Sequence, residues 1–123
     1  MNHAAKIICF FCGVYYSLVG ALLFVAPAFF FGKIAPIGLY NRHYAVDLGS
    51  FVLPLGLFLL LAVRYVKWSK PVIALTALGS TLHLLSHLRD GLQSAAAVLA
   101  DALFLAVAVL LIIPFLVARE VRT

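Results

Sequence analysis

Charged residues are scarce in this sequence. Only 9 Lys and Arg and 4 Asp and Glu occur among 123 residues, so that 11% of the chain is charged and 66% is hydrophobic. A soluble globular domain carries about 25% charged residues, which cover its water-facing surface. The composition therefore excludes a soluble fold. The cations occur in small clusters between apolar runs, a distribution that argues against a basic surface for nucleic acid.

Sequence motifs of the common enzyme classes are also absent. The chain has no nucleotide-binding loop, no Ser/His/Asp arrangement and no glycine-rich phosphate cradle. It has no internal repeat, and its length allows one domain. The sequence thus leaves open whether the protein is an enzyme.

Long apolar runs indicate where the chain crosses a membrane. About 20 apolar residues in a helix span the hydrocarbon core of a bilayer. The sequence predicts four such helices, in the ranges 7–31, 43–66, 71–88 and 93–117. Because the connections between them are short, consecutive helices should be antiparallel neighbours. We therefore expect an all-α protein in which residues 1–123 form a single transmembrane domain, an up-down four-helix bundle.

Small residues are spaced along one face of the first two predicted helices. Gly13, Ser17 and Gly20 form such a stripe on the first helix, and Gly49 and Gly56 lie on the second. Small residues let helix backbones approach each other closely in lipid. We expect these stripes to pack helices together, within one chain or between copies.

Positive residues are divided unequally between the two sides of this bundle. Cytoplasmic loops of membrane proteins carry an excess of Lys and Arg. The side that holds the termini has the larger set of cations: Lys6, Arg64, Lys67, Lys70, Arg119 and Arg122 against Lys33, Arg42 and Arg89. The imbalance predicts that both termini are cytoplasmic.

Ionisable residues within the apolar runs gather near the opposite, outer side. His43 and Asp47 begin the second predicted helix, and His83 and His87 lie near the end of the third. Residues four apart share a helix face, so each of these is a pair. Asp101 lies about 12 Å inside the fourth predicted helix. Three helices are therefore expected to place His and Asp side chains at similar depths near one side of the membrane.

This set of side chains suits a metal ion. An aspartate at such depth costs about 2.5–3.5 kcal/mol unless it is neutral or paired. Imidazole and carboxylate together are ligands for divalent transition metals such as Zn, Fe, Mn or Cu. We predict a metal site whose ligands are Asp47, His83, His87 and Asp101, with His43 and Asp90 as supporting or entrance residues.

Other functions fit the same residues. Asp47, His83 and Asp101 could form a hydrogen-bonded network that locks helix packing or carries protons in a non-catalytic membrane subunit. Haem ligation would use His43 or His83, but the two acids argue against it. An enzyme that acts on a lipid or a quinone would need a wide cavity beside Asp47 and Asp101. A transporter built from four short helices would need a dimer.

Cys9 and Cys12 form a C-x-x-C pattern at the start of the first predicted helix. Such a pair can exchange disulfides or capture a soft metal. Cysteines in lipid more often pack as small hydrophobic residues. We favour packing because these two lie a bilayer away from the His and Asp residues.

Residues 41–90 resemble part of a group of known membrane proteins. The segment Asn41–Gly49, followed by a long apolar helix and then by His83–Asp90, looks like a group of small bacterial membrane proteins with no settled activity. They are similar to the DoxX-like four-helix proteins in size and helix count. The resemblance implies this fold and a bacterial inner membrane, and it implies no mechanism. The expected surroundings are the lipid bilayer and either a homo-oligomer or a larger membrane complex.

Overall fold

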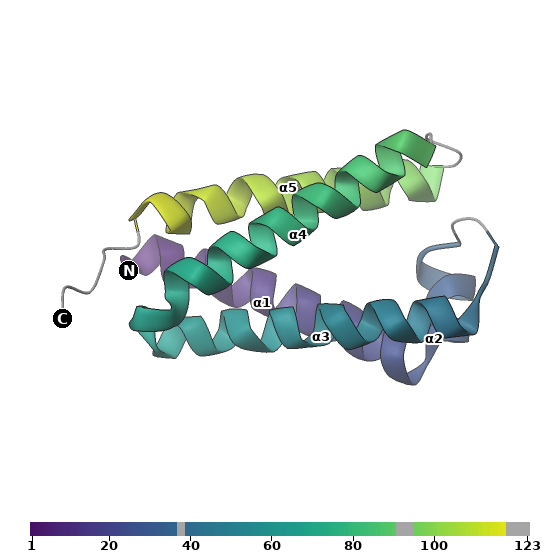
Figure 1. Ribbon diagram of the computed structural model, residues 1–123, viewed down its shortest axis with the longest axis horizontal. Helices are drawn as coiled ribbons and strands as arrows, with labels where there is room; N and C mark the ends of the chain where they lie inside the picture. The colour runs from purple at the N-terminus through teal and green to yellow at the C-terminus, as the bar shows by residue number, and fades with distance from the viewer. Residues whose placement is uncertain (37–38, 91–94, 118–123) are drawn as a thin grey trace.

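A computed structural model describes residues 1–36, 39–90 and 95–117 of the protein. All regular structure in these residues is helical (Figure 1). Four helices are long, namely α1 (His3–Val25), α3 (Arg42–Arg64), α4 (Ser69–Asp90) and α5 (Ala95–Val117). Three further elements are short: α2 (Pro27–Phe29), the π-helical turn η1 (Phe30–Ile34) and the 3-10 turn η2 (Val66–Trp68).

Three of the described helices are long and apolar enough to cross a bilayer. α1 and α3 have 23 residues each, and residues Ser69–Arg89 of α4 add 21. At 1.5 Å per residue, 23 residues extend about 34 Å, which exceeds the ~30 Å hydrocarbon core. α5 contributes a shorter apolar stretch, Leu105–Leu116, within the described residues. The protein is therefore an all-α, multi-pass membrane protein.

The outer surface of the bundle has the character expected of a lipid-facing one. Large apolar side chains such as Phe11, Leu18 and Leu116 are more than half exposed. In water such a surface would be an aggregation or interaction site. In a bilayer these side chains contact acyl chains, so their exposure carries no penalty.

The first predicted helix, 7–31, is interrupted. α1 ends at Val25, and the N–H of Ala26 donates to the carbonyl of Leu22 over 2.9 Å. Pro27 follows, and it has no N–H with which to continue the ladder. The chain restarts at Pro27 as α2 and widens into η1. The range predicted as one helix, 7–31, thus contains the long helix α1 and then the separate short elements α2 and η1.

α1 packs along α3 through the predicted glycine stripes. A Cβ atom built on Gly49 would lie 2.7 Å from the backbone N of Phe24, and one on Gly56 would lie 2.8 Å from the carbonyl oxygen of Gly13. Real Cβ atoms essentially never show contacts this short, so the two backbones touch. The prediction that small residues pack the helices is confirmed, and the contact lies within one chain.

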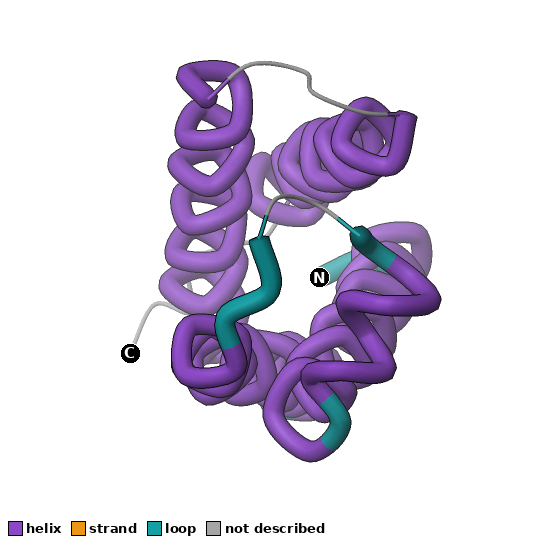
Figure 2. Tube along the Cα trace, turned by 90° about the vertical axis from the view of Figure 1, so that its right-hand side faces the viewer, coloured by secondary structure: helices purple, strands orange, loops and turns teal. Residues whose placement is uncertain are grey.

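The bundle is closed at one end and open at the other. α4 packs along α5, and this pair meets the α1–α3 pair at the end where α1 begins and α5 ends (Figure 1). There the four long helices share one buried core, made of Cys9, Cys12, Tyr16, Leu59, Ile73, Val107 and Leu111. Toward the other end the two pairs diverge, as the end-on view also shows (Figure 2). We call this the open end.

Candidate functional site

The first histidine–aspartate pair lies in the first turns of α3, at the open end. The side chain of Asn41 caps this helix by accepting a hydrogen bond of 3.1 Å from the backbone N–H of Tyr44. His43 Nε2 then lies 3.3 Å from Asp47 Oδ2, one turn apart on the same helix. The predicted His43–Asp47 pair is confirmed. Both side chains are largely exposed, at 90% and 56%.

The second pair lies near the end of α4. The rings of His83 and His87 have centroids 4.6 Å apart, and both residues are partly buried. Between them, the hydroxyl of Ser86 donates to the carbonyl oxygen of His83 over 2.8 Å. Two imidazoles one turn apart on a helix can offer two nitrogen ligands to one ion. The prediction that these histidines form a pair is therefore confirmed.

The two pairs do not combine into one metal cluster among the described side chains. They lie on α3 and α4 near the open end, where these helices have diverged (Figure 1). Within the described part of the chain, no group of three or more His, Cys, Asp or Glu could hold one ion. Asp47 therefore does not join His83 and His87. The side chains of Asp90 and Asp101 lie outside the described ones, so their part in a site with His83 and His87 stays a prediction.

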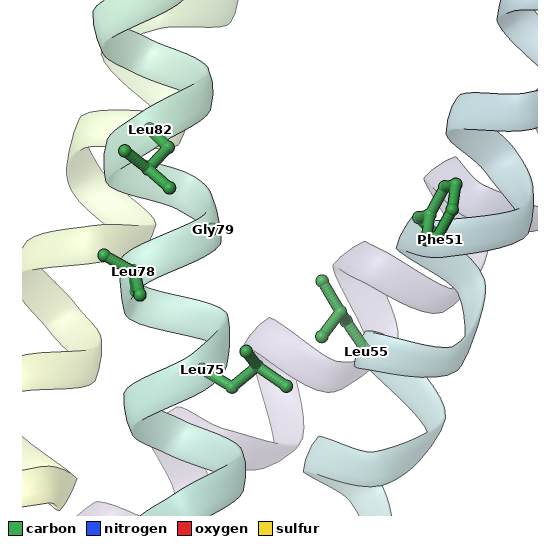
Figure 3. A pocket seen from close by; sticks show the side chains of 6 residues that line it. All are labelled: Phe51, Leu55, Leu75, Leu78, Gly79 and Leu82. Atoms are coloured by element: carbon green, nitrogen blue, oxygen red, sulfur yellow. The ribbon is translucent and has the colours of Figure 1, made fainter.

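An apolar cleft separates α3 from α4. Its volume is about 280 Å³. Leu55 and Leu75 point toward each other from the two helices, and the cleft widens above them (Figure 3). The full lining is Phe51, Leu55, Leu75, Leu78, Gly79 and Leu82. Sequence reasoning named such a cavity only as a requirement for a lipid or quinone enzyme and did not predict it.

Comparisons with known proteins assign no family. A scan against protein-family models, a search of curated proteins and a search of solved structures each found no match. No family is therefore identified for this chain, and the resemblance of residues 41–90 to a group of small bacterial membrane proteins stays a prediction.

A polar contact between helices lies deeper, within the core. The hydroxyl groups of Tyr16 on α1 and Ser80 on α4 are hydrogen-bonded to each other, and both residues are buried. Ser80 also donates to the carbonyl oxygen of Thr76 over 2.7 Å. Because the Ser80 proton is used there, the Tyr16 hydroxyl is the donor to Ser80. This link was missed in the sequence. Its signal is the spacing of Thr76 and Ser80 on one face of an apolar helix.

The two cysteines are part of the same core. Cys9 is fully buried and Cys12 nearly so, at the closed end of the bundle. They pack against Tyr16, Leu59 and Ile73. Their burial supports the packing interpretation, because thiol exchange needs an accessible sulfur atom.

Proposed function

We propose that this multi-pass membrane protein binds a divalent transition metal near the outer end of α4, with His83 and His87 as two of its ligands. The observation that carries the proposal is the ring pair itself, with centroids 4.6 Å apart on one face of a helix. Neutral imidazole is a common ligand of Zn, Fe and Cu. Two histidines supply half of a four-coordinate site, so further ligands are needed.

Asp101 is our candidate for the third ligand. The sequence places it in α5, the helix that follows the His83–His87 pair. Asp90, three residues after His87, would support the site or line its entrance. Asp47 is paired with His43 on α3. It would join the same ion only if the open ends of α3 and α4 moved together.

Metal content tests this proposal. We expect the purified protein to retain about one equivalent of Zn, Fe, Mn or Cu, as one shared site requires. The His83→Ala and His87→Ala variants should each lose most of it, because both rings act through one ion. Cys9→Ser and Cys12→Ser are the controls and should keep the metal, since those residues lie in the closed-end core. Metal-free wild-type protein whose stability is unchanged by a chelator would contradict the proposal.

That contradicting result would favour a second function. The protein would then be a non-catalytic membrane subunit whose polar side chains lock helix packing or carry protons. The buried Tyr16–Ser80 hydrogen bond supports this alternative, because it shows a polar side-chain pair that joins two helices of this bundle.

We also propose that the protein lies in a bacterial inner membrane with both termini in the cytoplasm. α1 begins and α5 ends at the same end of the bundle (Figure 1), and the excess of Lys and Arg lies on that side. A reporter enzyme that works only in the cytoplasm should therefore be active when it is fused after Thr123. A reporter that works only in the periplasm should be inactive at the same position. The reverse pattern would place the open end in the cytoplasm.

A further inference from the structure

The connection between α3 and α4 places cations at the edge of the bilayer. Both helices are long enough to cross a membrane, and only residues 65–68 separate them, at the closed end of the bundle (Figure 1). Helix ends joined by so short a connection lie at one membrane–water interface. Arg64 ends α3, Lys67 lies in η2, and Lys70 lies in the first turn of α4. We call residues 64–70 the basic turn.

The charged and aromatic side chains of the basic turn point out of the bundle. Arg64 and Lys67 are exposed, as are Tyr65, at 54%, and Trp68, at 60%. Ser69, by contrast, is fully buried. The guanidinium carbon of Arg64 lies 5.8 Å from the centre of the Tyr65 ring, which is a cation–π contact. Because tyrosine and tryptophan prefer the headgroup region of a bilayer, these cations lie at headgroup depth.

Acidic residues do not balance the charge at this end. Asp47 lies near the start of α3 and Asp90 at the end of α4, both at the open end, and Asp101 lies in the first half of α5. Glu120 follows α5 and lies outside the described residues. Even with Glu120 counted, one acidic side chain stands against six cations on this side: Lys6, Arg64, Lys67, Lys70, Arg119 and Arg122. Such an excess attracts anionic lipid headgroups.

An apolar stripe on α3 leads from the basic turn into the bilayer. Leu57 and Leu61 precede Arg64 by seven and three residues, so the three share one face of the helix. Both leucines are 48% exposed. In a bilayer they contact an acyl chain, and Arg64 lies at the headgroup end of the same stripe. A phospholipid can use both the cations and the stripe, whereas a free phosphate ion can use the cations alone.

We infer that the basic turn binds an anionic phospholipid, whose phosphodiester pairs with Arg64 and Lys67 and whose acyl chain lies along Leu57 and Leu61. Arginine binds phosphate through two hydrogen bonds of fixed geometry, and lysine binds it as a point charge. A zwitterionic lipid also carries a headgroup cation, which the basic turn repels. The inference goes beyond the proposed metal site and does not depend on it, because the two sites lie at opposite ends of the bundle.

The fluorescence of Trp68 tests this inference, because Trp68 is the only tryptophan in the sequence and lies in the basic turn. The full-length protein would be reconstituted in phosphatidylcholine with EDTA present. Phosphatidylglycerol or phosphatidylcholine with chains brominated close to the headgroup would then be added, since bromine quenches a tryptophan that it contacts. We expect phosphatidylglycerol to occupy the site at least about fivefold more tightly, the factor that one Lys or Arg contributes near an anionic headgroup.

Substitution of the two exposed cations tests their role. In Arg64→Gln/Lys67→Gln the two lipids should quench Trp68 almost equally, because the charges that distinguish the headgroups are lost. Lys33→Gln/Arg42→Gln is the matched control. It removes two exposed cations from η1 and from the start of α3, at the open end, so that it lowers the net charge equally. This control should keep the wild-type preference for phosphatidylglycerol.

Any of four results would overturn the inference. The first is equal quenching by the two lipids in the wild type, and the second is an unchanged preference in Arg64→Gln/Lys67→Gln. The third is an equal loss of preference in the open-end control, which would make net charge the cause. The fourth is loss of the preference in inorganic phosphate but not in chloride of the same ionic strength, which would indicate a site for a free anion. Lys67→Gln alone, which should also weaken the preference, replaces the double variant if that protein does not fold.

Discussion

Replacing Gly56 with alanine is expected to lower the free energy of unfolding by about 1–3 kcal/mol. The added Cβ atom would lie 2.6 Å from the hydroxyl oxygen of Ser17 and 2.8 Å from the carbonyl oxygen of Gly13, and its nearest neighbour is the Ser17 backbone nitrogen. A side chain can rotate away from such a contact, but backbone cannot. α1 and α3 would have to separate, and close backbone packing is a main source of helix association in lipid.

Gly79→Ala is the matched control for this experiment. Gly79 also lies within a membrane-spanning helix, but its Cβ atom would have Leu55 Cδ1 as its nearest neighbour, at an ordinary van der Waals distance of 4.0 Å. Alanine favours a helix over glycine by up to about 1 kcal/mol, so this variant should be as stable as the wild type or slightly more so. Reversible unfolding of both variants in mixed micelles, followed by circular dichroism, measures the difference. If Gly56→Ala unfolds at the same denaturant fraction as Gly79→Ala, the close α1–α3 contact is wrong.

Replacing Asp101 with asparagine is expected to weaken metal binding at least about tenfold while the bundle stays folded, because an anionic ligand is lost. Asparagine keeps the size and hydrogen-bonding capacity of aspartate and removes the charge that is costly in hydrocarbon. Stability without metal should therefore stay level or rise. The variant separates ligation from packing because the two functions respond to it differently.

Metal affinity and thermal stability would be measured together on the Asp101→Asn protein. Equal metal content in variant and wild type, with equal or greater stability, would remove Asp101 from the ligands. The metal would then have to be held by His83 and His87 with other residues. A variant that loses stability without metal would instead make the Asp101 charge part of a paired packing network.

Features that depend on short stretches of sequence could be predicted well. The ranges 43–66 and 93–117 correspond to Arg42–Arg64 and Ala95–Val117, because long apolar runs and the Asn41 cap act locally. The glycine stripes also predicted close helix packing, which the structure shows between α1 and α3. The end of α1 could have been predicted, since Pro27 stood inside the run 7–31 and lacks the donor that a continuing helix needs.

Features that depend on the angle between helices could not be predicted. Helical spacing correctly paired His43 with Asp47 and His83 with His87, because both partners lie on one helix. Whether the pairs meet depends on how α3 crosses α4. That angle is set by the side chains at the closed end, such as Leu59 and Ile73, and by the Tyr16–Ser80 contact. No local pattern encodes it, so the cleft was not foreseen.

The uneven packing of this bundle has a consequence for its biogenesis. The glycine contact between α1 and α3 lies wholly within residues 3–64, which leave the ribosome before α4 does. This hairpin can therefore assemble in the bilayer as soon as α3 has been inserted, without help from the rest of the chain. α4 and α5 then join a preformed partner through the core at one end. The membrane insertion machinery thus receives two helical hairpins in succession, α1–α3 and then α4–α5, and the second packs against the first.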